Sequence, residues 1–212
     1  MSIADVRRDY VRLGLNEADV APEPVAQLRH WLDQALSAGV VDVTAMVLAT
    51  ATTNGRPSAR VVLLKGLDER GLTFFTNYLS RKGRQLAENP QAAVTFFWPE
   101  IERQVRVEGA VEVISAVESD EYFRSRPRDS QLGAWVSDQS AIVSGGRAEL
   151  DRRLSELTAR FADTDVPRPT HWGGYRLAPA AVEFWQGRPG RLHDRLLYTL
   201  SGNRWRIERL SP

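Results

Sequence analysis

Apolar residues recur along this chain with two different spacings, one helical and one extended. Between positions 24 and 38 they return every three or four residues, as on one face of a helix, at Val25, Leu28, Leu32, Ala35 and Leu36. Pro24 suits the first turn of a helix and Gly39 suits its end. The pattern therefore predicts a helix over residues 24–38.

The extended spacing dominates the rest of the first half of the chain. Runs of β-branched and aromatic residues between turn-forming residues predict strands at 45–50, 59–67, 72–77, 92–98 and 103–113. Along the last of these, one side is apolar and carries Val105, Val107, Val111 and Val113. That alternation is typical of a strand with one face in water.

Three more helices and a hairpin complete the predicted elements. A short helix over 80–90 is closed by Asn-Pro, and apolar residues in helical phase predict another over 147–161. Ser115 and Glu118 have the spacing of a capping box and open the third helix, which continues through residue 124. The turn Ser-Gly-Asn joins two strands within 196–210.

This order of elements indicates an α+β fold with a mainly antiparallel sheet, because strands and helices do not alternate strictly. Closing the sheet into a barrel with peripheral helices is the natural way to remove its edges. The chain contains no repeat and no long linker, so we expect one domain over residues 1–212.

Composition narrows the function classes. Hydrophobic residues make up 42% of the 212 residues, so we expect a globular protein. The formal net charge is +1, so the protein has no overall positive field that would attract nucleic acid. The chain has no cysteine, which excludes disulfides, thiolate nucleophiles and Fe–S clusters. The N-terminus lacks an apolar signal core, and we expect a cytoplasmic protein.

Several common catalytic motifs are absent. The three histidines are far apart and none has HExxH spacing, so we expect no metal site. The Gly-Gly pairs are too short for a P-loop or a dinucleotide fingerprint, and no G-x-S-x-G elbow supports a hydrolase. Any anion site must therefore be assembled locally from scattered cations.

Two pairs of cations are candidates for such a site. Arg60 and Lys65 bracket an apolar run in a predicted strand; they either mark its ends or reach one anion. The second interpretation requires a twist or bulge, because positions five apart point to opposite faces. Arg81 and Lys82 open a predicted helix, where backbone N–H groups favour phosphate, although two solvated cations fit the same pattern.

A third candidate lies between residues 122 and 130. Tyr122 and Arg126 are four apart and share a helix face, whereas Pro127 is predicted to end that helix. Ser130 then falls in the following turn. A phenol, a guanidinium and a hydroxyl that converge would suit a phosphate monoester.

The most concentrated group of charged and aromatic side chains lies in the stretch F-W-Q-G-R-P-G-R-L-H-D-R, residues 184–195. If its end is extended, Arg191, His193 and Arg195 lie on one face and Leu192 lies on the other. A polar outer face with Leu192 inside is one interpretation. The other is an anion held between like charges, which otherwise repel each other on one strand face.

These stretches, in this order, resemble the pyridoxine/pyridoxamine 5′-phosphate oxidase family. E-F-W-Q-G-x-x-x-R-L-H-D-R is similar to the family signature and is highly specific. A-R-V-V-L-L-K, F-F-T-N-Y-x-S-R-K-G, Y-F-x-x-R-P-x-x-S and W-V-S-D-Q-S add support, and the resemblance runs from R-R-D-Y near residue 7 to the end. It implies an FMN-binding split barrel and a homodimer with two FMN sites at the interface.

The resemblance also assigns residues. It implies FMN contacts, drawn from both subunits, by Arg60, Val61, Val62, Leu63, Leu64, Lys65, Phe75, Thr76, Arg81, Lys82, Gln104, Gln139, Ser140, Trp185 and Arg195. It implies substrate contacts by Lys65, Tyr122, Arg126 and Ser130 on the phosphate and by Arg191 and His193, the catalytic pair, on the ring. A segment within residues 1–20 would close over the substrate through Arg7, Arg8, Asp9 and Tyr10.

The reaction implied by the resemblance is the oxidation of pyridoxine or pyridoxamine 5′-phosphate to pyridoxal 5′-phosphate. A hydride passes from C4′ to flavin N5, and O₂ reoxidises the flavin with release of H₂O₂. Phe75 stands where relatives often have tyrosine, which would cost one hydroxyl contact with the cofactor. Two alternatives stay open: a carrier that holds the ligands without turnover, and a split-barrel reductase with another flavin-like cofactor.

Overall fold

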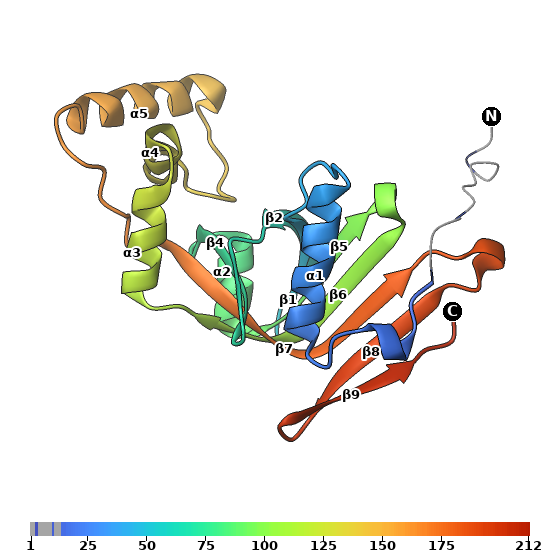
Figure 1. The fold of residues 1–212 in the computed structure, drawn as a ribbon. Coiled ribbons are helices and arrows are strands. Elements are labelled where there is room, and N and C mark those ends of the chain that lie inside the picture. The colour runs from blue at the N-terminus through green and yellow to red at the C-terminus, as the bar shows by residue number, and fades with distance from the viewer. Residues whose placement is uncertain (1–2, 4–9, 11–13) are drawn as a thin grey trace.

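The computed structural model describes residues 3, 10 and 14–212 (Figure 1). Its helices are α1 (Pro24–Ser37), α2 (Arg81–Glu88), α3 (Ala116–Ser125), α4 (Arg128–Val136) and α5 (Gly146–Arg160), with 3₁₀ turns η2 (Glu17–Asp19), η3 (Pro99–Ile101) and η4 (Pro189–Arg191). Its strands are β1 (Ala45–Ala51), β2 (Pro57–Leu63), β3 (Gly66–Asp68), β4 (Gly71–Asn77), β5 (Gln91–Trp98), β6 (Arg103–Val113), β7 (Trp172–Gln186), β8 (Asp194–Ser201) and β9 (Arg204–Arg209). The predicted helices are confirmed to within a few residues, and long β7 was not predicted.

All described strands join one curled antiparallel sheet with the order β2-β1-β5-β6-β7-β4-β3 (Figure 1). Strand β7 pairs with β6 along most of its length. On its other side, its first half pairs with β4 and its second half pairs with β8, which continues into β9. The predicted α+β class, mainly antiparallel, is confirmed, and the curled sheet agrees with a split barrel.

The main core lies where the inner face of this sheet meets α1. Trp31 of α1 packs edge-on against Phe184 of β7 with ring centroids 5.1 Å apart, and both side chains are buried. Val105 and Val107 of β6 are fully buried on the same side, as the alternation predicts. Val113 departs from the prediction, because it is the last residue of β6 and its side chain is 59% exposed.

A bulge interrupts the pairing of β6 with β7 at Glu108 and Gly109. A Cβ on Gly109 would lie 1.9 Å from the backbone oxygen of Ala178, so the two strands approach too closely there for any side chain. Because a bulge increases local twist, this one helps to curl the sheet.

Helices α3, α4 and α5 stand together at one end of the sheet, away from β8 and β9 (Figure 1). The predicted capping box is confirmed, because Ser115 and Glu118 hydrogen-bond each other's backbone N–H groups. Pro127 ends α3 as predicted, but it also caps α4, so Ser130 lies in the first turn of a new helix rather than in a turn. Proline is compatible with a helix start because it donates no N–H group.

The stretch around residue 191 also differs from the prediction. Residues 189–191 form η4, and Arg191 adopts a positive φ of 61°, so the chain is not extended until β8 begins at Asp194. Pro189 and Gly190 favour this tight turn over a strand. Leu192 is exposed, which contradicts the interpretation that it points inward.

Candidate functional site

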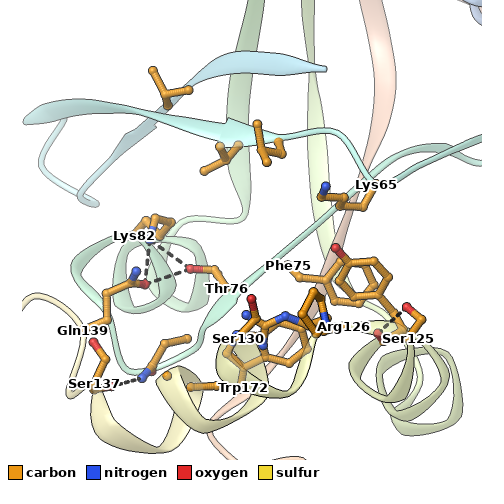
Figure 2. A pocket seen from close by; sticks show the side chains of 18 residues that line it. Lys65, Phe75, Thr76, Lys82, Ser125, Arg126, Ser130, Ser137, Gln139 and Trp172 are labelled. Atoms are coloured by element: carbon orange, nitrogen blue, oxygen red, sulfur yellow. Dashed lines mark hydrogen bonds between the residues drawn. The ribbon is translucent and has the colours of Figure 1, made fainter. Parts of the chain in front are cut away.

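A cavity of about 660 Å³ lies between strands β2 and β4 and helices α3 and α4 (Figure 2). The structure brings many of the predicted site residues to its walls: Val61, Val62, Leu63, Lys65, Phe75, Thr76, Lys82, Tyr122, Arg126, Ser130 and Gln139. The sequence interpretation missed other wall residues, among them Asn77, Ser125, Pro127, Gly133, Ala134, Ser137 and Trp172. Asn77, Pro127 and Ser137 stand inside motifs that carry the family resemblance, which was the available signal; most of the others are small or neutral residues with no signal of their own.

Lys82 marks one end of the cavity. Its Nζ donates to Thr76 Oγ1 and to Gln139 Oε1, each at 2.9 Å, and Thr76 Oγ1 donates to the same Gln139 oxygen (Figure 2). Burial, and secondarily the charge of Arg60, lowers the pKa of Lys82 to about 8. No described carboxylate forms an ion pair with Lys82, so this end of the cavity favours an anion.

Arg60 extends this positive region behind the cavity wall. Its guanidinium donates to Leu48 O, Thr50 Oγ1 and Ser58 Oγ, and burial together with Arg81 lowers its pKa. These acceptors are all uncharged, so the positive charge is held in place without being neutralised.

Arg81 and Ser140 stand at the start of α2. The side chain of Ser80 caps the helix by accepting from Gly83 N–H, and the Arg81 N–H donates to Ser140 Oγ at 3.2 Å. Neither Arg81 nor Ser140 lines the main cavity; Arg81 faces a smaller cavity of about 250 Å³ beside it. The charge of Arg81 acts on Arg60, whose pKa it helps to lower.

Arg126 marks the other polar end of the cavity (Figure 2). Its guanidinium carbon lies 4.5 Å from the centre of the Trp172 ring, while its Nη1 is buried without any hydrogen-bond partner among the described residues. Burial lowers the pKa of Arg126 and raises that of Tyr122. A buried guanidinium nitrogen without an acceptor is costly, and an anionic oxygen in the cavity would satisfy it.

Phe75 belongs to a stack of three aromatic rings at the Arg126 end of the cavity. Its ring lies parallel to that of Tyr122 with centroids 3.9 Å apart, and Trp172 stacks on the other members of the group at 5.5 and 6.2 Å. Phe75 thus holds the Tyr122 ring in one orientation beside Arg126. Aromatic stacking of this kind is worth about 1 kcal/mol beyond burial.

The remaining predicted residues gather elsewhere, in a group that we call the C-terminal cluster: Tyr10, Gln104, Trp185, His193 and Arg195. Gln104, Trp185 and Arg195 are direct neighbours across β6, β7 and β8. The rings of Tyr10 and His193 lie 5.5 and 4.7 Å from the Trp185 ring. Arg191 is exposed and is the last residue of η4, two residues before His193 of this cluster.

Arg195 already has a charge partner. Its Nε donates to Glu183 Oε1 at 2.7 Å, and Glu183 is almost fully buried. The predicted repulsion between like charges is therefore relieved by Glu183, without a ligand. Alternation along β7 places residues 183 and 185 on one face, and Arg195 is the neighbour of Trp185 on β8. The overlooked signal for the Glu183–Arg195 pair was this two-residue spacing.

Strand β7 separates the C-terminal cluster from the cavity. Trp172 lines the cavity at one end of the strand and Trp185 belongs to the cluster at the other. Thirteen residues of extended chain span roughly 40 Å, and Figure 1 shows these ends far apart. One chain alone does not bring both groups to a single small ligand.

Four more predicted positions remain, one of them in the described part of the chain and three of them not. The side chain of Leu64 is buried in the main core and faces no cavity. Arg7, Arg8 and Asp9 lie outside the described residues, so their predicted role stays a prediction.

Two family patterns match this chain. The pattern described as pyridoxamine 5′-phosphate oxidase matches residues 32–161, and the one described as pyridoxine 5′-phosphate oxidase C-terminal dimerisation region matches residues 172–212. Proteins named pyridoxine/pyridoxamine 5′-phosphate oxidase are similar to the whole chain. The one from Cyanothece sp. (strain PCC 7425) is 54% identical over 212 residues, and the one from Burkholderia thailandensis is 56% identical over 214; each alignment covers 100% of this chain and 99% of the relative.

Solved structures agree with the fold. PhzG from Burkholderia lata 383, in complex with tetrahydrophenazine-1-carboxylic acid, superposes with a TM-score of 0.91 at 35% identity, over 97% of this chain and 100% of that one. A pyridoxamine 5′-phosphate oxidase-related, FMN-binding protein from Nostoc punctiforme gives a TM-score of 0.67 at 20% identity, over 92% and 99%. With two family patterns and full-length relatives in agreement, the chain belongs to the pyridoxamine 5′-phosphate oxidase family.

Proposed function

We propose that this protein oxidises pyridoxamine 5′-phosphate and pyridoxine 5′-phosphate to pyridoxal 5′-phosphate, with FMN as its cofactor. The observation that carries the proposal is a single cavity with two separate cationic ends, one at Lys82 and one at Arg126. FMN and the vitamin each carry one phosphate, so two anion sites joined by an apolar and aromatic wall suit this pair of molecules.

The residues at the Lys82 end fit the cofactor. Lys82 and Arg60 offer positive charge that is held by uncharged oxygens, and Gln139 and Thr76 offer further polar contacts. Strand β2 carries Val61 and Leu63, whose exposed apolar side chains face the cavity and suit a flat ring system. When bound, FMN would accept a hydride from C4′ of the substrate and return the electrons to O₂, giving H₂O₂.

The residues at the Arg126 end fit the substrate phosphate. Arg126 Nη1 would donate to a phosphate oxygen, which gives the orphaned nitrogen an acceptor. Ser130 lies in the first turn of α4, where the positive end of the helix dipole adds to the attraction, and Lys65 supplies another cation. Tyr122, held by Phe75, contributes its hydroxyl to the same region.

A homodimer completes the site in this proposal. The C-terminal cluster and the cavity lie at opposite ends of β7, so the partner copy would have to bring its own cluster to the cavity. Exposed Val47 of β1 and Phe97 of β5, which do not line the cavity, offer an apolar surface for that contact. Arg191 and His193 of the partner subunit would then orient the pyridine ring, and Tyr10 would help to exclude water.

PhzG suggests a second candidate function, because its structure holds a tetrahydrophenazine carboxylic acid. Arg126 could pair with a carboxylate as well as with a phosphate. A phosphate, however, offers three oxygens to Arg126, Ser130 and Lys65, and this number of donors favours the phosphate ester.

The test is aerobic turnover of FMN-loaded protein with pyridoxamine 5′-phosphate, followed by aldehyde absorbance and peroxide release. Unphosphorylated pyridoxamine and a reduced phenazine carboxylate serve as comparison substrates. We expect turnover of the phosphate ester and a kcat/KM at least about a hundredfold lower for pyridoxamine, since several charged hydrogen bonds are lost. Binding without turnover would contradict the oxidase and favour a carrier, whereas preferred oxidation of the phenazine would favour the second candidate.

A further inference from the structure

The N-terminal segment is fastened to the last two strands by a group of ionic hydrogen bonds that the proposed reaction does not use. Asp194 accepts from Leu15 N–H at 3.0 Å through Oδ2 and from Arg209 Nη1 at 2.6 Å through Oδ1. Arg209 also donates to both carboxylate oxygens of Glu17, at 2.9 and 2.8 Å, and to Leu15 O at 2.9 Å. We call these four residues, Leu15, Glu17, Asp194 and Arg209, the clasp.

The backbone at Gly14 and Leu15, which the clasp holds, has little room to move. The Leu15 side chain enters the main core and is only 7% exposed. Arg188 approaches Asp194 Oδ2 to 3.6 Å and passes so close to Gly14 that a Cβ there would meet Arg188 Nη1 at 2.6 Å. Arg209 is the last residue of β9 and contacts the segment from the edge of the sheet.

Tyr10 is the residue that this arrangement would hold in place. Its ring meets the rings of Trp185 and His193 edge-on, at 5.5 and 5.4 Å, and it lies so close to Gly187 that a Cβ there would be 2.6 Å from the Tyr10 ring. Gly14 follows Tyr10 by four residues, a span of at most about 14 Å. Fixing Gly14 and Leu15 therefore keeps Tyr10 near the two aromatic rings.

We propose that Asp194 and Arg209 are positioning residues: by clasping Leu15 and Glu17 they hold Tyr10 against Trp185 and His193. The inference rests on the proposed function, in which Tyr10 and His193 border the substrate. Neither Asp194 nor Arg209 lines the cavity, and the proposed function assigns neither of them a contact with the substrate or the cofactor. Asp194 follows His193 directly in the sequence. Through its hydrogen bond with Leu15, Asp194 therefore joins the turn that carries His193 to the N-terminal segment.

Stability and positioning can be separated for the Arg209–Glu17 pair because this part of the clasp lies near the surface. The side chains of Arg209 and Glu17 are 38% and 48% exposed, and solvent screening leaves such an ion pair little weight in folding. The pair still restricts where the N-terminal segment lies. Hydrogen bonds to Arg209 draw the pKa of Glu17 below its ordinary range, so the pair stays charged at neutral pH.

The experiment compares Arg209→Gln and Asp194→Asn with a matched control, Arg206→Gln. Arg206 is on the same strand and pairs at 2.7 Å with Glu208, away from the N-terminal segment. We expect both clasp variants to lose roughly ten- to hundredfold in kcat/KM for pyridoxamine 5′-phosphate, mainly through KM, with unchanged FMN content and melting temperature. The control should match the wild type.

A double-mutant cycle with Tyr10→Ala then tests the route of the effect. If the clasp acts through Tyr10, Arg209→Gln causes no further loss in the Tyr10→Ala background. Additive losses, or equal losses in the control, would overturn the inference. Trypsin cleavage after Arg12, which requires no turnover, should be faster in the clasp variants; unchanged cleavage would also overturn it. Because this readout needs no oxidase activity, a protein that lacks turnover contradicts the proposed function separately.

Discussion

Lys82 gives the sharpest prediction about the cofactor end of the cavity. Its pKa falls from 10.5 to about 8, first because the ammonium is buried and second because of Arg60. Each unit of pKa corresponds to about 1.4 kcal/mol, so holding this charge costs the free protein roughly 3 kcal/mol. A bound phosphate would offset that cost and restore an ordinary pKa. Binding then takes up a proton above pH 8, and the affinity for FMN falls as the pH rises.

The assay is titration of flavin fluorescence against apoprotein between pH 7.5 and pH 9.5. A pKa that moves from about 8 to its ordinary value predicts roughly 20-fold weaker binding at the upper pH. Riboflavin, which lacks the phosphate, should show no such slope. Lys82→Met should bind FMN more weakly at pH 7.5 and without the slope. Arg84→Gln, which removes an exposed cation from the same helix, should behave as the wild type. A flat wild-type profile, or a slope retained in Lys82→Met, would refute the reasoning.

Two predictions concern stability. Gly109→Ala places a Cβ 1.9 Å from Ala178 O at the bulge and should cost at least about 2 kcal/mol in urea unfolding, whereas Gly133→Ala meets no atom within 4 Å in α4 and should add up to about 1 kcal/mol; equal effects would contradict the bulge argument. Hydrogen bonds from Arg176 hold the pKa of Glu118 at about 2, so Glu118 stabilises the fold above pH 4.5 and loses this effect as the pH falls toward 2. Because solvent screens this carboxylate, whose side chain is 34% exposed, Glu118→Gln should lower the free energy of unfolding by only about 1 kcal/mol at pH 7 and by less at pH 3; a pH-independent difference would count against this pair.

Local chemistry explains which elements could be predicted from the sequence. The capping box at Ser115 and Glu118 needs only four residues of chain, and the start of α1 at Pro24 follows from the fixed φ of proline. The Pro189-Gly190 turn has a signal in the sequence, but nothing in the residue type of Arg191 indicates that it adopts a positive φ and belongs to this turn. Ser130 was misplaced because Pro127 both ends one helix and begins the next.

The site was harder to predict than the elements. The resemblance to the family assigned residues to one site, but the fold places them at two ends of β7. The distance between the cavity and the C-terminal cluster cannot be obtained from any periodicity in the sequence. Likewise, Glu183 neutralises Arg195 across a strand pair whose register depends on the whole sheet. Tertiary pairing, rather than local pattern, decides which cations remain available for a ligand.

The central claim is that two copies of the chain build each site, with the cavity from one and the C-terminal cluster from the other. Arg126→Gln in the cavity and Arg191→Ala beside the cluster should each nearly abolish turnover. When the two variants are co-expressed, half of the dimers are mixed, and each of these carries one site free of both substitutions. Co-expression should therefore restore about a quarter of wild-type activity. No recovery above that of the separate variants would contradict the claim.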